Sequence, residues 1–177
     1  MARGELAHRR RACTVPGVKK SSGKRSSCPC HSGLNYGECC APRHDGSRPA
    51  ETPEALMRAR FSAFATGLGD YLVDTLSSSH GDRALDRAAL VLALSRAKQT
   101  QRFLGLEIRG THVDGDRGEV LFHARIFERG VDRSFTERSS FAKEDGAWRY
   151  VDGEVDDGSG PADRRPVLSV ADDAGDE

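Results

Sequence analysis

The chain has 177 residues, and its 27 lysines and arginines balance its 27 aspartates and glutamates, so the formal net charge is zero. This length holds one ordinary domain with small attachments. No apolar run approaches the roughly 20 residues that a membrane-spanning helix needs, and the arginine-rich N-terminus lacks the apolar segment of a secretory signal. The composition therefore argues against two large domains and against a membrane protein, and it favours a cytoplasmic location.

The zero net charge conceals opposite charges at the two ends of the chain. Residues 1–27 carry eight Lys and Arg against one Glu, whereas residues 152–177 carry nine Asp and Glu against two Arg. Such charge runs favour unstructured ends, so we predict a disordered basic extension over 1–27 and a disordered acidic tail over 154–177. The basic extension could bind the phosphates of a nucleic acid.

Four of the five cysteines lie close together, in the stretch CPCHSGLNYGECC at 28–40. Thiolates are soft ligands, and four of them can surround zinc as a tetrahedron with Zn–S distances of about 2.3 Å. Pro29 and Ser32-Gly33 favour the curl that would bring the first two thiols to one ion, and a short helix starting near Leu34 would set the last two about 100° apart. We therefore predict a structural zinc site whose ligands are Cys28, Cys30, Cys39 and Cys40.

Four thiolates leave no coordination position for an activated water, so the metal would shape the segment and would not catalyse. Disulfides are an alternative. Bonds within the Cys-x-Cys or the Cys-Cys pair would close very small rings, and a cytoplasmic compartment reduces disulfides. Crossed pairs are left open by the spacing. His31, inside the cluster, or His44, shortly after it, could also replace one cysteine as a ligand.

Helical signals begin at Thr52-Pro53-Glu54, after a stretch at 45–51 with the composition of a linker. Thr can cap the first free amides, Pro suits the first helical position, and Glu favours the positive end of the helix dipole. The apolar residues that follow recur at helical spacing. They are Met57, Phe61, Phe64 and Leu68. Gly67 can end this helix, Asp70 can cap a short second one, and a third is predicted over about 86–98.

After residue 100 the hydrophobic period changes from helical to alternating, as is typical of strands. Turn signals at 114–115, 129–130 and 145–146 separate four such runs, the later two at about 131–143 and 147–152. This pattern predicts an antiparallel meander of four strands. Because such a sheet cannot bury its apolar face alone, the three helices should lie across it. The expected fold class is therefore α+β, a cone of helices on a curved sheet.

Several segments of the chain resemble, in matching order, those of a known family. They are the cysteine cluster with Ala41-Pro42 and His44, TPEALMRARFSAFATG at 52–67 with Asp70-Tyr71-Leu72, LGLEI at 104–108, ERSSF at 137–141 and WRYVDG at 148–153. The cluster is similar to the SEC-C motif, a small zinc-binding module also found at the C-terminus of the SecA translocation ATPase. The whole of 28–153 resembles the YchJ (UPF0225) family, in which that module precedes an NTF2-like domain.

The resemblance implies a SEC-C module at 28–44, a linker at 45–51 and an NTF2-like domain at 52–153, with about three helices on a curved, mostly antiparallel four-stranded sheet. It also implies that the four cysteines hold zinc. Three sites depart from the family's pattern. His31 stands where Gly is usual, Thr75-Leu76-Ser77 where Trp-His-Pro is common, and Phe103 where Trp is common.

The NTF2-like fold hosts both enzymes and pure binding domains, so the fold alone does not decide whether this chain is catalytic. The polar residues that could line a pocket in the cone are His123, Arg125, Glu137, Arg138, Tyr150 and Asp152. They form no recognisable catalytic signature, and Arg58 or Arg60 could pair with Glu137 or Asp152 in a structural role.

We therefore expect a non-enzymatic adaptor whose zinc module contacts a protein partner. The related module of SecA contacts a chaperone and ribosomes, which suggests the class of partner. A small-ligand binder or an enzyme that uses the cone pocket is the alternative.

Overall fold

The computed structural model describes residues 26–156. The segments predicted to be disordered or to bind nucleic acid, at the two chain ends, lie almost entirely outside this range. The N-terminal part holds two short helical segments, η1 (Tyr36–Glu38) and α1 (Ala41–His44). The next elements are α2 (Pro53–Thr66), α3 (Gly69–Asp74), η2 (Gly81–Ala84) and α4 (Arg87–Thr100). The strands are β1 (Gln101–Asp114), β2 (Arg117–Glu128), β3 (Val131–Asp132), β4 (Phe135–Glu144) and β5 (Ala147–Asp156).

The strands form one antiparallel sheet in the order β1-β2-β4-β5, which confirms the meander. The third predicted run is broken in two, so the sheet gains a short extra strand, β3, which pairs only with the end of β2. The break has a local cause. The Asp132 carboxylate accepts a hydrogen bond from the Ser134 amide at 2.8 Å, and this turn takes the chain out of the ladder before β4 begins.

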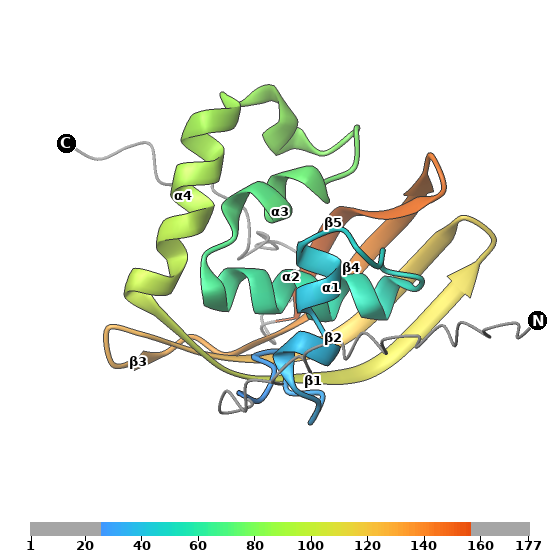
Figure 1. The fold of residues 1–177 in the computed structure, drawn as a ribbon. Helices are drawn as coiled ribbons and strands as arrows, with labels where there is room; N and C mark the ends of the chain where they lie inside the picture. The colour runs from blue at the N-terminus through green and yellow to red at the C-terminus, as the bar shows by residue number, and fades with distance from the viewer. Residues whose placement is uncertain (1–25, 157–177) are drawn as a thin grey trace, which may run out of the picture.

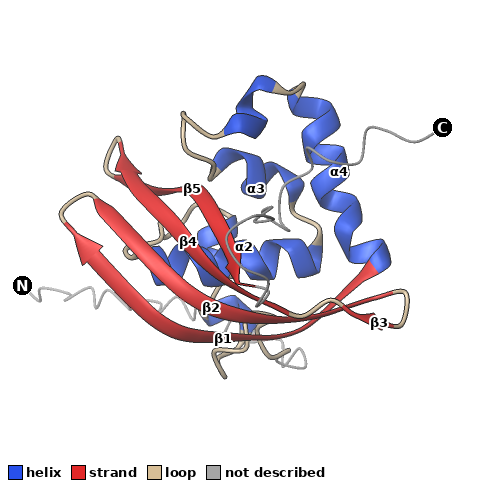
Figure 2. Ribbon diagram, turned by 180° about the vertical axis from the view of Figure 1, so that it is seen from behind, coloured by secondary structure: helices blue, strands red, loops and turns tan. Residues whose placement is uncertain are grey.

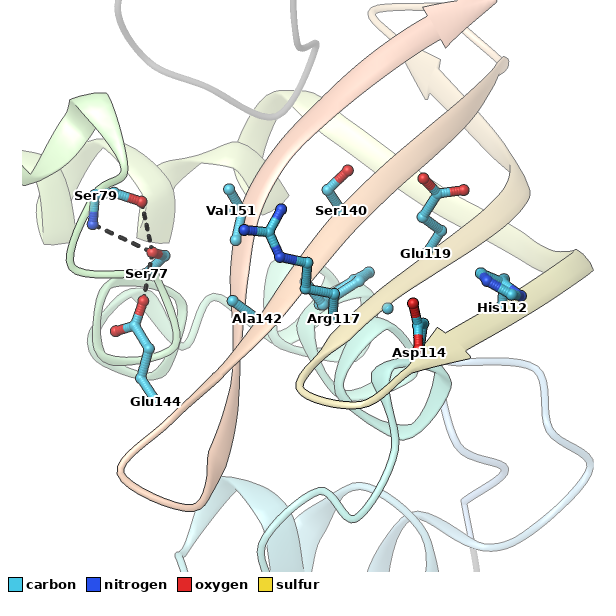
Figure 3. A pocket seen from close by; sticks show the side chains of 12 residues that line it. Ser77, Ser79, His112, Asp114, Arg117, Glu119, Ser140, Ala142, Glu144 and Val151 are labelled. Atoms are coloured by element: carbon cyan, nitrogen blue, oxygen red, sulfur yellow. Dashed lines mark hydrogen bonds between the residues drawn. The ribbon is translucent and has the colours of Figure 1, made fainter.

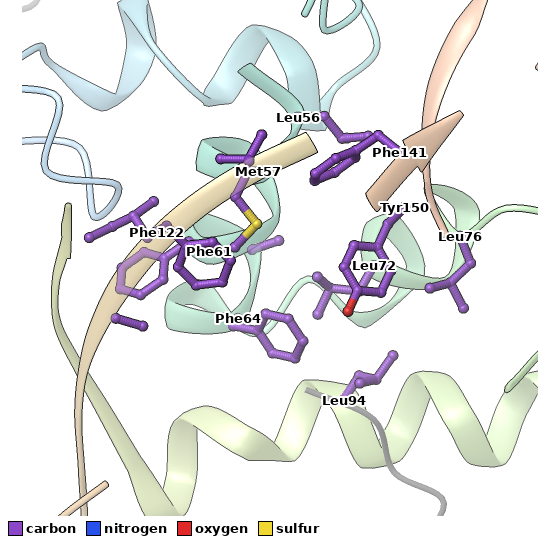
Figure 4. Close-up of a cluster of buried hydrophobic side chains, with 14 of the residues drawn as sticks. Leu56, Met57, Phe61, Phe64, Leu72, Leu76, Leu94, Phe122, Phe141 and Tyr150 are labelled. Atoms are coloured by element: carbon purple, nitrogen blue, oxygen red, sulfur yellow. The ribbon is translucent and has the colours of Figure 1, made fainter. Parts of the chain in front are cut away.

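The helices lie on one side of the curved sheet, as Figures 1 and 2 show from opposite directions. The apolar face of α2 enters the core as predicted, with Met57, Phe61 and Phe64 buried among residues of the sheet and the other helices (Figure 4). The Thr52 hydroxyl caps α2 by accepting from the Ala55 amide at 3.1 Å. Gly67 ends the helix in the left-handed conformation, with φ of 75°.

The start of α3 differs from the prediction, because Asp70 lies in its first turn and does not cap it. The helix begins one residue earlier, at Gly69. A Cβ at this position would lie 2.2 Å from the Val91 carbonyl oxygen of α4. Only glycine therefore permits the close approach of α3 and α4 here.

Two segments differ from expectation. Strand β5 continues to Asp156, beyond the predicted run at about 147–152, because it stays paired with β4 as far as Thr136. The stretch at 45–51 is not a loose connection, since the Trp148 indole donates to the Glu51 carbonyl at 3.1 Å and Ala50 packs on the core. Within 26–156, none of the helices is long and apolar enough to cross a membrane.

Candidate metal centre

The first two cysteines lie on a tight hairpin at the start of the described chain. The Cys28 amide donates to the Leu34 carbonyl at 2.8 Å, and the Tyr36 amide donates to the Ser26 carbonyl at 3.1 Å. The module therefore begins at Ser26, two residues before the predicted boundary. Within the hairpin the His31 amide donates to the Cys28 carbonyl at 3.0 Å, and this turn curls the Cys-x-Cys segment as its sequence suggested.

The last two cysteines lie between two helical segments and not within one helix. The expected helix from Leu34 is wrong, because residues 34–36 pair with 26–28 and η1 begins only at Tyr36. Cys39 follows η1 with φ of −106° and ψ of −91°, and Cys40 caps α1. The backbone changes direction between these two residues, and this change brings the Cys39 and Cys40 thiols close together.

The four sulfurs form a compact group whose members all lie within 4.8 Å of one another. The Cys30 and Cys39 sulfurs are 3.5 Å apart, and those of Cys39 and Cys40 are 3.8 Å apart. A tetrahedral ion with metal–sulfur distances of about 2.3 Å requires sulfurs about 3.8 Å apart, whereas a disulfide requires about 2.05 Å. The cysteines are free thiols with the spacing of a four-sulfur metal site.

The thiols of Cys28, Cys30 and Cys40 have shifted pKa values. The pKa of Cys30 is lowered to about 4, mainly by hydrogen bonding with Cys40. Hydrogen bonding with Cys30 and, as the second cause, burial raise the pKa of Cys40. Burial raises the pKa of Cys28. One thiolate therefore forms readily and opposes the formation of others. A cation at the centre would supply the positive charge that all four thiolates need.

Three arginines hold the loops that carry the cysteines by donating to main-chain carbonyls. Arg43 donates to the Cys39 carbonyl, Arg48 to the Glu38 carbonyl at 2.9 Å, and Arg58 to the Cys30 carbonyl at 3.3 Å. Arg58 also pairs with Glu54 at 2.8 Å. It is therefore not the predicted partner of Glu137 or Asp152, and it places positive charge beside the sulfurs.

Neither histidine belongs to the sulfur group. His31 is exposed and is not among the clustered ligands. His44 uses both ring nitrogens elsewhere: Nδ1 lies 2.8 Å from the Tyr36 hydroxyl, and Nε2 lies 2.9 Å from the Ala59 carbonyl oxygen. Because a carbonyl can only accept, Nε2 donates, and in the neutral ring Nδ1 then accepts from Tyr36. Burial lowers the pKa of His44, which favours this neutral ring.

The segment that holds the four cysteines, residues 26–44, packs against α2, and we call it the metal module. Ala59 of α2 is fully buried and forms one apolar cluster with the four cysteines. The Cys40 thiol donates to the Arg58 carbonyl at 3.6 Å, and the Cys28 sulfur lies 3.9 Å from the Ser62 hydroxyl. The metal site therefore shapes a segment that is part of the packing of the larger domain.

The six residues predicted for a cone pocket do not share one. Glu137 and Tyr150 face the core, where the Tyr150 hydroxyl donates to Glu137 Oε1 at 3.5 Å. The other four lie away from it: Arg125 and Asp152 are exposed, Arg138 pairs with Glu119 at 3.3 Å, and His123 bonds Thr136 at 3.1 Å. Strand alternation turns Arg138 away from the face that carries Glu137, and an irregularity in the pairing of β4 with β5 leaves Asp152 exposed although it lies two residues from Tyr150.

Glu137 lies near other buried polar side chains in the core. Arg60, also buried, donates to the Leu72 carbonyl at 2.8 Å and the Thr75 hydroxyl at 2.7 Å, and its guanidinium carbon lies 4.5 Å from the centre of the Tyr150 ring. Arg60 makes no direct ion pair with Glu137. Burial raises the pKa of Glu137, and its Oε2 has no hydrogen-bond partner. Burial therefore favours the neutral form of this carboxyl.

A polar groove of about 440 Å³ lies elsewhere, between the end of the β1–β2 hairpin and the loop after α3 (Figure 3). Residues such as His112, Arg117 and Glu119 line it on one side, and Ser77 lines it on the other, where its hydroxyl donates to Glu144 at 2.6 Å. None of the six predicted residues lines it. Sequence reasoning missed this groove because four separate segments build it.

The fold and the cysteine site can now be compared with known proteins. Residues 52–153 match the family profile described as "YchJ, middle NTF2-like domain", and residues 26–42 match the SEC-C motif. The chain belongs to the YchJ (UPF0225) family. The UPF0225 protein YchJ of Shigella dysenteriae is 41% identical over 128 residues, which cover 71% of this chain and 81% of that protein. A UPF0225 protein of Corynebacterium efficiens is 44% identical over 132 residues, which cover 72% and 92%.

Solved structures of SEC-C proteins share the architecture of this YchJ family member. The solution structure of a SEC-C motif containing protein from Rhodopseudomonas palustris is 37% identical with a TM-score of 0.63, and the match covers 73% of this chain and 98% of that one. A crystal structure of a SEC-C motif containing protein from Psychrobacter arcticus is 27% identical with a TM-score of 0.59, and covers 80% and 88%.

The positions expected to depart from the family's pattern have defined local roles. His31 adopts a positive φ of 57°, a conformation that glycine favours. Thr75 accepts a hydrogen bond from Arg60, and the Phe103 ring lies 5.5 Å from that of Phe61. Thr75 is therefore buried and Phe103 packs against the core, whereas His31 retains local strain.

Proposed function

We propose that this protein is a non-enzymatic accessory or adaptor protein whose zinc-filled SEC-C module mediates contact with a protein partner, with the NTF2-like cone as its support. The observation that carries the proposal is the closed ligand set. Four sulfurs, each 6% exposed or less, account for all four positions of a tetrahedral ion. No position is left for an activated water or a substrate, so the metal has a structural role.

Zinc fits the donor set better than other common cations. Soft thiolates select zinc or iron–sulfur centres over magnesium and calcium, and the sulfur spacing suits a single small ion. Bound zinc would supply the charge that holds four thiolates together. The chain's own residues then fix the shape of the module, because Arg43 donates to the Cys39 carbonyl and Arg58 donates to the Cys30 carbonyl.

Metal analysis tests the first half of this proposal. We expect protein purified under reducing conditions to contain about one zinc per chain. A Cys39→Ser/Cys40→Ser variant should lose the metal, whereas Cys13→Ser, which changes the one cysteine outside the cluster, should retain it. Wild-type protein without metal, or with an iron–sulfur chromophore, would contradict the zinc assignment.

Affinity capture tests the second half. By analogy with the SecA module, the partner is expected among chaperones or ribosome-associated proteins. Wild-type protein should recover a defined partner that the Cys39→Ser/Cys40→Ser variant does not. Recovery of the same proteins by both would show that the metal module does not mediate the contact.

A small-ligand binder or enzyme remains the second candidate, and one observation favours it. Glu137 is a buried carboxyl with a raised pKa and one unpartnered oxygen, and it lies beside Tyr150, a pairing that enzymes use for proton transfer. Glu137 is 0% exposed, however, and a substrate would need the core to open. Thermal-shift screening should find a ligand whose effect is lost in Glu137→Gln and Tyr150→Phe if this candidate is right; no hit in a broad metabolite library would eliminate it.

A further inference from the structure

A pocket of about 450 Å³ lies at the junction between the metal module and the cone, and it includes none of the cysteines. Tyr36 and His44 of the module line it together with Asp45, the residue after α1. Leu68, Asp70 and Tyr71, at the start of α3, line the other side. We call this the junction pocket. Because both parts of the chain line it, it exists only while the module is docked on the cone.

Three aromatic rings line the junction pocket, those of Tyr36, His44 and Tyr71. The Tyr36 and His44 ring centres are 5.7 Å apart, and those of His44 and Tyr71 are 4.7 Å apart with the rings edge-on. His44 is fixed between the two tyrosines by its hydrogen bonds to the Tyr36 hydroxyl and the Ala59 carbonyl. The aromatic wall is therefore preorganised, and a ligand would not have to order it.

The charged residues that line the junction pocket are both acidic. Asp45 follows α1, and one of its oxygens accepts from the Ser47 amide at 2.9 Å. Asp70 is 70% exposed and shares Arg87 with Asp74, at 2.9 and 2.8 Å. One carboxylate thus comes from each side of the junction, beside aromatic rings whose faces attract cations.

We propose that the junction pocket binds an arginine side chain of the protein partner. A guanidinium is planar, so it can stack on tyrosine while it donates two parallel hydrogen bonds to a carboxylate; a lysine ammonium can do neither. The inference rests on the adaptor function proposed above and adds to it the chemistry of the partner, a segment with exposed arginine. We assign this occupant because its positive charge complements the carboxylates of Asp45 and Asp70.

The test is an NMR titration of the full-length, metal-loaded protein with the peptide acetyl-Gly-Ser-Arg-Ser-Gly-amide, and with the same peptide carrying Lys or Glu in place of Arg. We expect the Arg peptide to shift the amide signals of Tyr36, Asp45 and Tyr71, the Lys peptide to bind more weakly and the Glu peptide not to bind. An Asp45→Asn/Asp70→Asn variant should bind the Arg peptide about tenfold more weakly or worse.

Asp74→Asn is the matched control, because Asp74 also bonds Arg87 but does not line the pocket. It should bind the Arg peptide as the wild type does. Equal losses in both variants, or shifts that do not distinguish Arg from Glu, would overturn the proposal. Binding that appears only in an R9S/R10S/R11S variant would overturn it too, because the chain's own basic extension would then be the occupant.

Partner capture separates this inference from the adaptor function on which it rests. If Asp45→Asn/Asp70→Asn recovers the partner as the wild type does while Cys39→Ser/Cys40→Ser loses it, the pocket assignment is wrong and the adaptor function stands. If the Arg peptide binds as described but no partner is recovered by the wild type, the pocket stands as an arginine site and the adaptor function fails.

Discussion

The His44 imidazole donates a hydrogen bond from Nε2 to the main-chain carbonyl of Ala59, at 2.9 Å. This bond joins α1 of the metal module to the middle of α2. In the neutral ring that burial favours, the other nitrogen accepts from the Tyr36 hydroxyl at 2.8 Å. Protonation would reverse this contact and place a charge in a partly buried site, so the docking of the module depends on the protonation state of one side chain.

This dependence predicts how stability varies with pH. Burial lowers the pKa of folded His44 below its ordinary value of 6.5. Above pH 6.5 both folded and unfolded chains hold a neutral ring; as the pH falls below 6.5, the unfolded chain takes up a proton that the folded chain excludes, and the free energy of unfolding falls.

We expect the His44→Gln substitution to remove the part of the fall in unfolding free energy at low pH that His44 causes. Between about pH 7.5 and pH 5.5, urea unfolding should show the wild type losing roughly 1 kcal/mol more than the variant. His80, whose pKa is also lowered by burial, is present in both proteins and cancels in the difference. Equal losses in the two proteins would show that His44 does not titrate on unfolding.

Glu137 predicts a pH dependence of the opposite sign. Burial raises its folded pKa above 4.5, so its contribution is fully present below pH 4.5 and is lost as the pH rises through the folded pKa. Glu137→Gln keeps the shape but cannot ionise. We expect this variant to gain stability relative to the wild type by roughly 1 kcal/mol between pH 4 and pH 8. Glu119→Gln, at the half-exposed carboxylate that pairs with Arg138, is the control and should show no comparable gain.

His31 offers a stabilising substitution. Its φ of 57° lies in the left-handed region, which a side chain disfavours. His31→Gly should raise the thermal unfolding temperature of the metal-loaded protein and add roughly 0.5 to 1 kcal/mol, because the relieved strain exceeds the added chain entropy. His31→Ala retains a Cβ and should give no gain; a gain as large as that of glycine would rule out backbone strain as the cause.

Gly153 makes room for the buried carboxyl. A Cβ at this position would lie 2.3 Å from Glu137 Oε1 and 2.7 Å from the Tyr150 hydroxyl. Gly153→Ala should therefore cost about 2 kcal/mol of stability, measured by chemical denaturation. Gly37→Ala is the matched control, since nothing lies within 4 Å of an added Cβ there. A neutral Gly153→Ala would mean that the Glu137 site is looser than its contacts indicate.

The elements that local chemistry determines could be predicted from the sequence. Thr52 caps α2, Gly67 ends it, and the turn residues divide the meander as expected, because each effect acts within a few residues. The clustering of the four cysteines was predictable for the same reason. Their local backbone was not, since the pairing of Leu34 with Cys28 uses residues that a helix would need.

The distribution of the predicted pocket residues was only partly predictable. The inward position of Glu137 follows from strand alternation, since Phe135 and Phe141 are buried on the same strand. Asp152 could not be placed in this way, because an irregularity between β4 and β5 at Ser140 and Phe141 interrupts the regular pairing. The junction pocket gave no sequence signal at all, because it arises only when the module docks.

The docking of the module on α2 also has a consequence for biosynthesis. All four sulfurs lie at 28–40, whereas the carbonyls and side chains that receive the module begin at Arg58. A ribosome therefore releases all four cysteines before it releases the helix that covers them. The thiols are accessible to a metal ion during that interval, before α2 packs against the module and Arg58 reaches the Cys30 carbonyl.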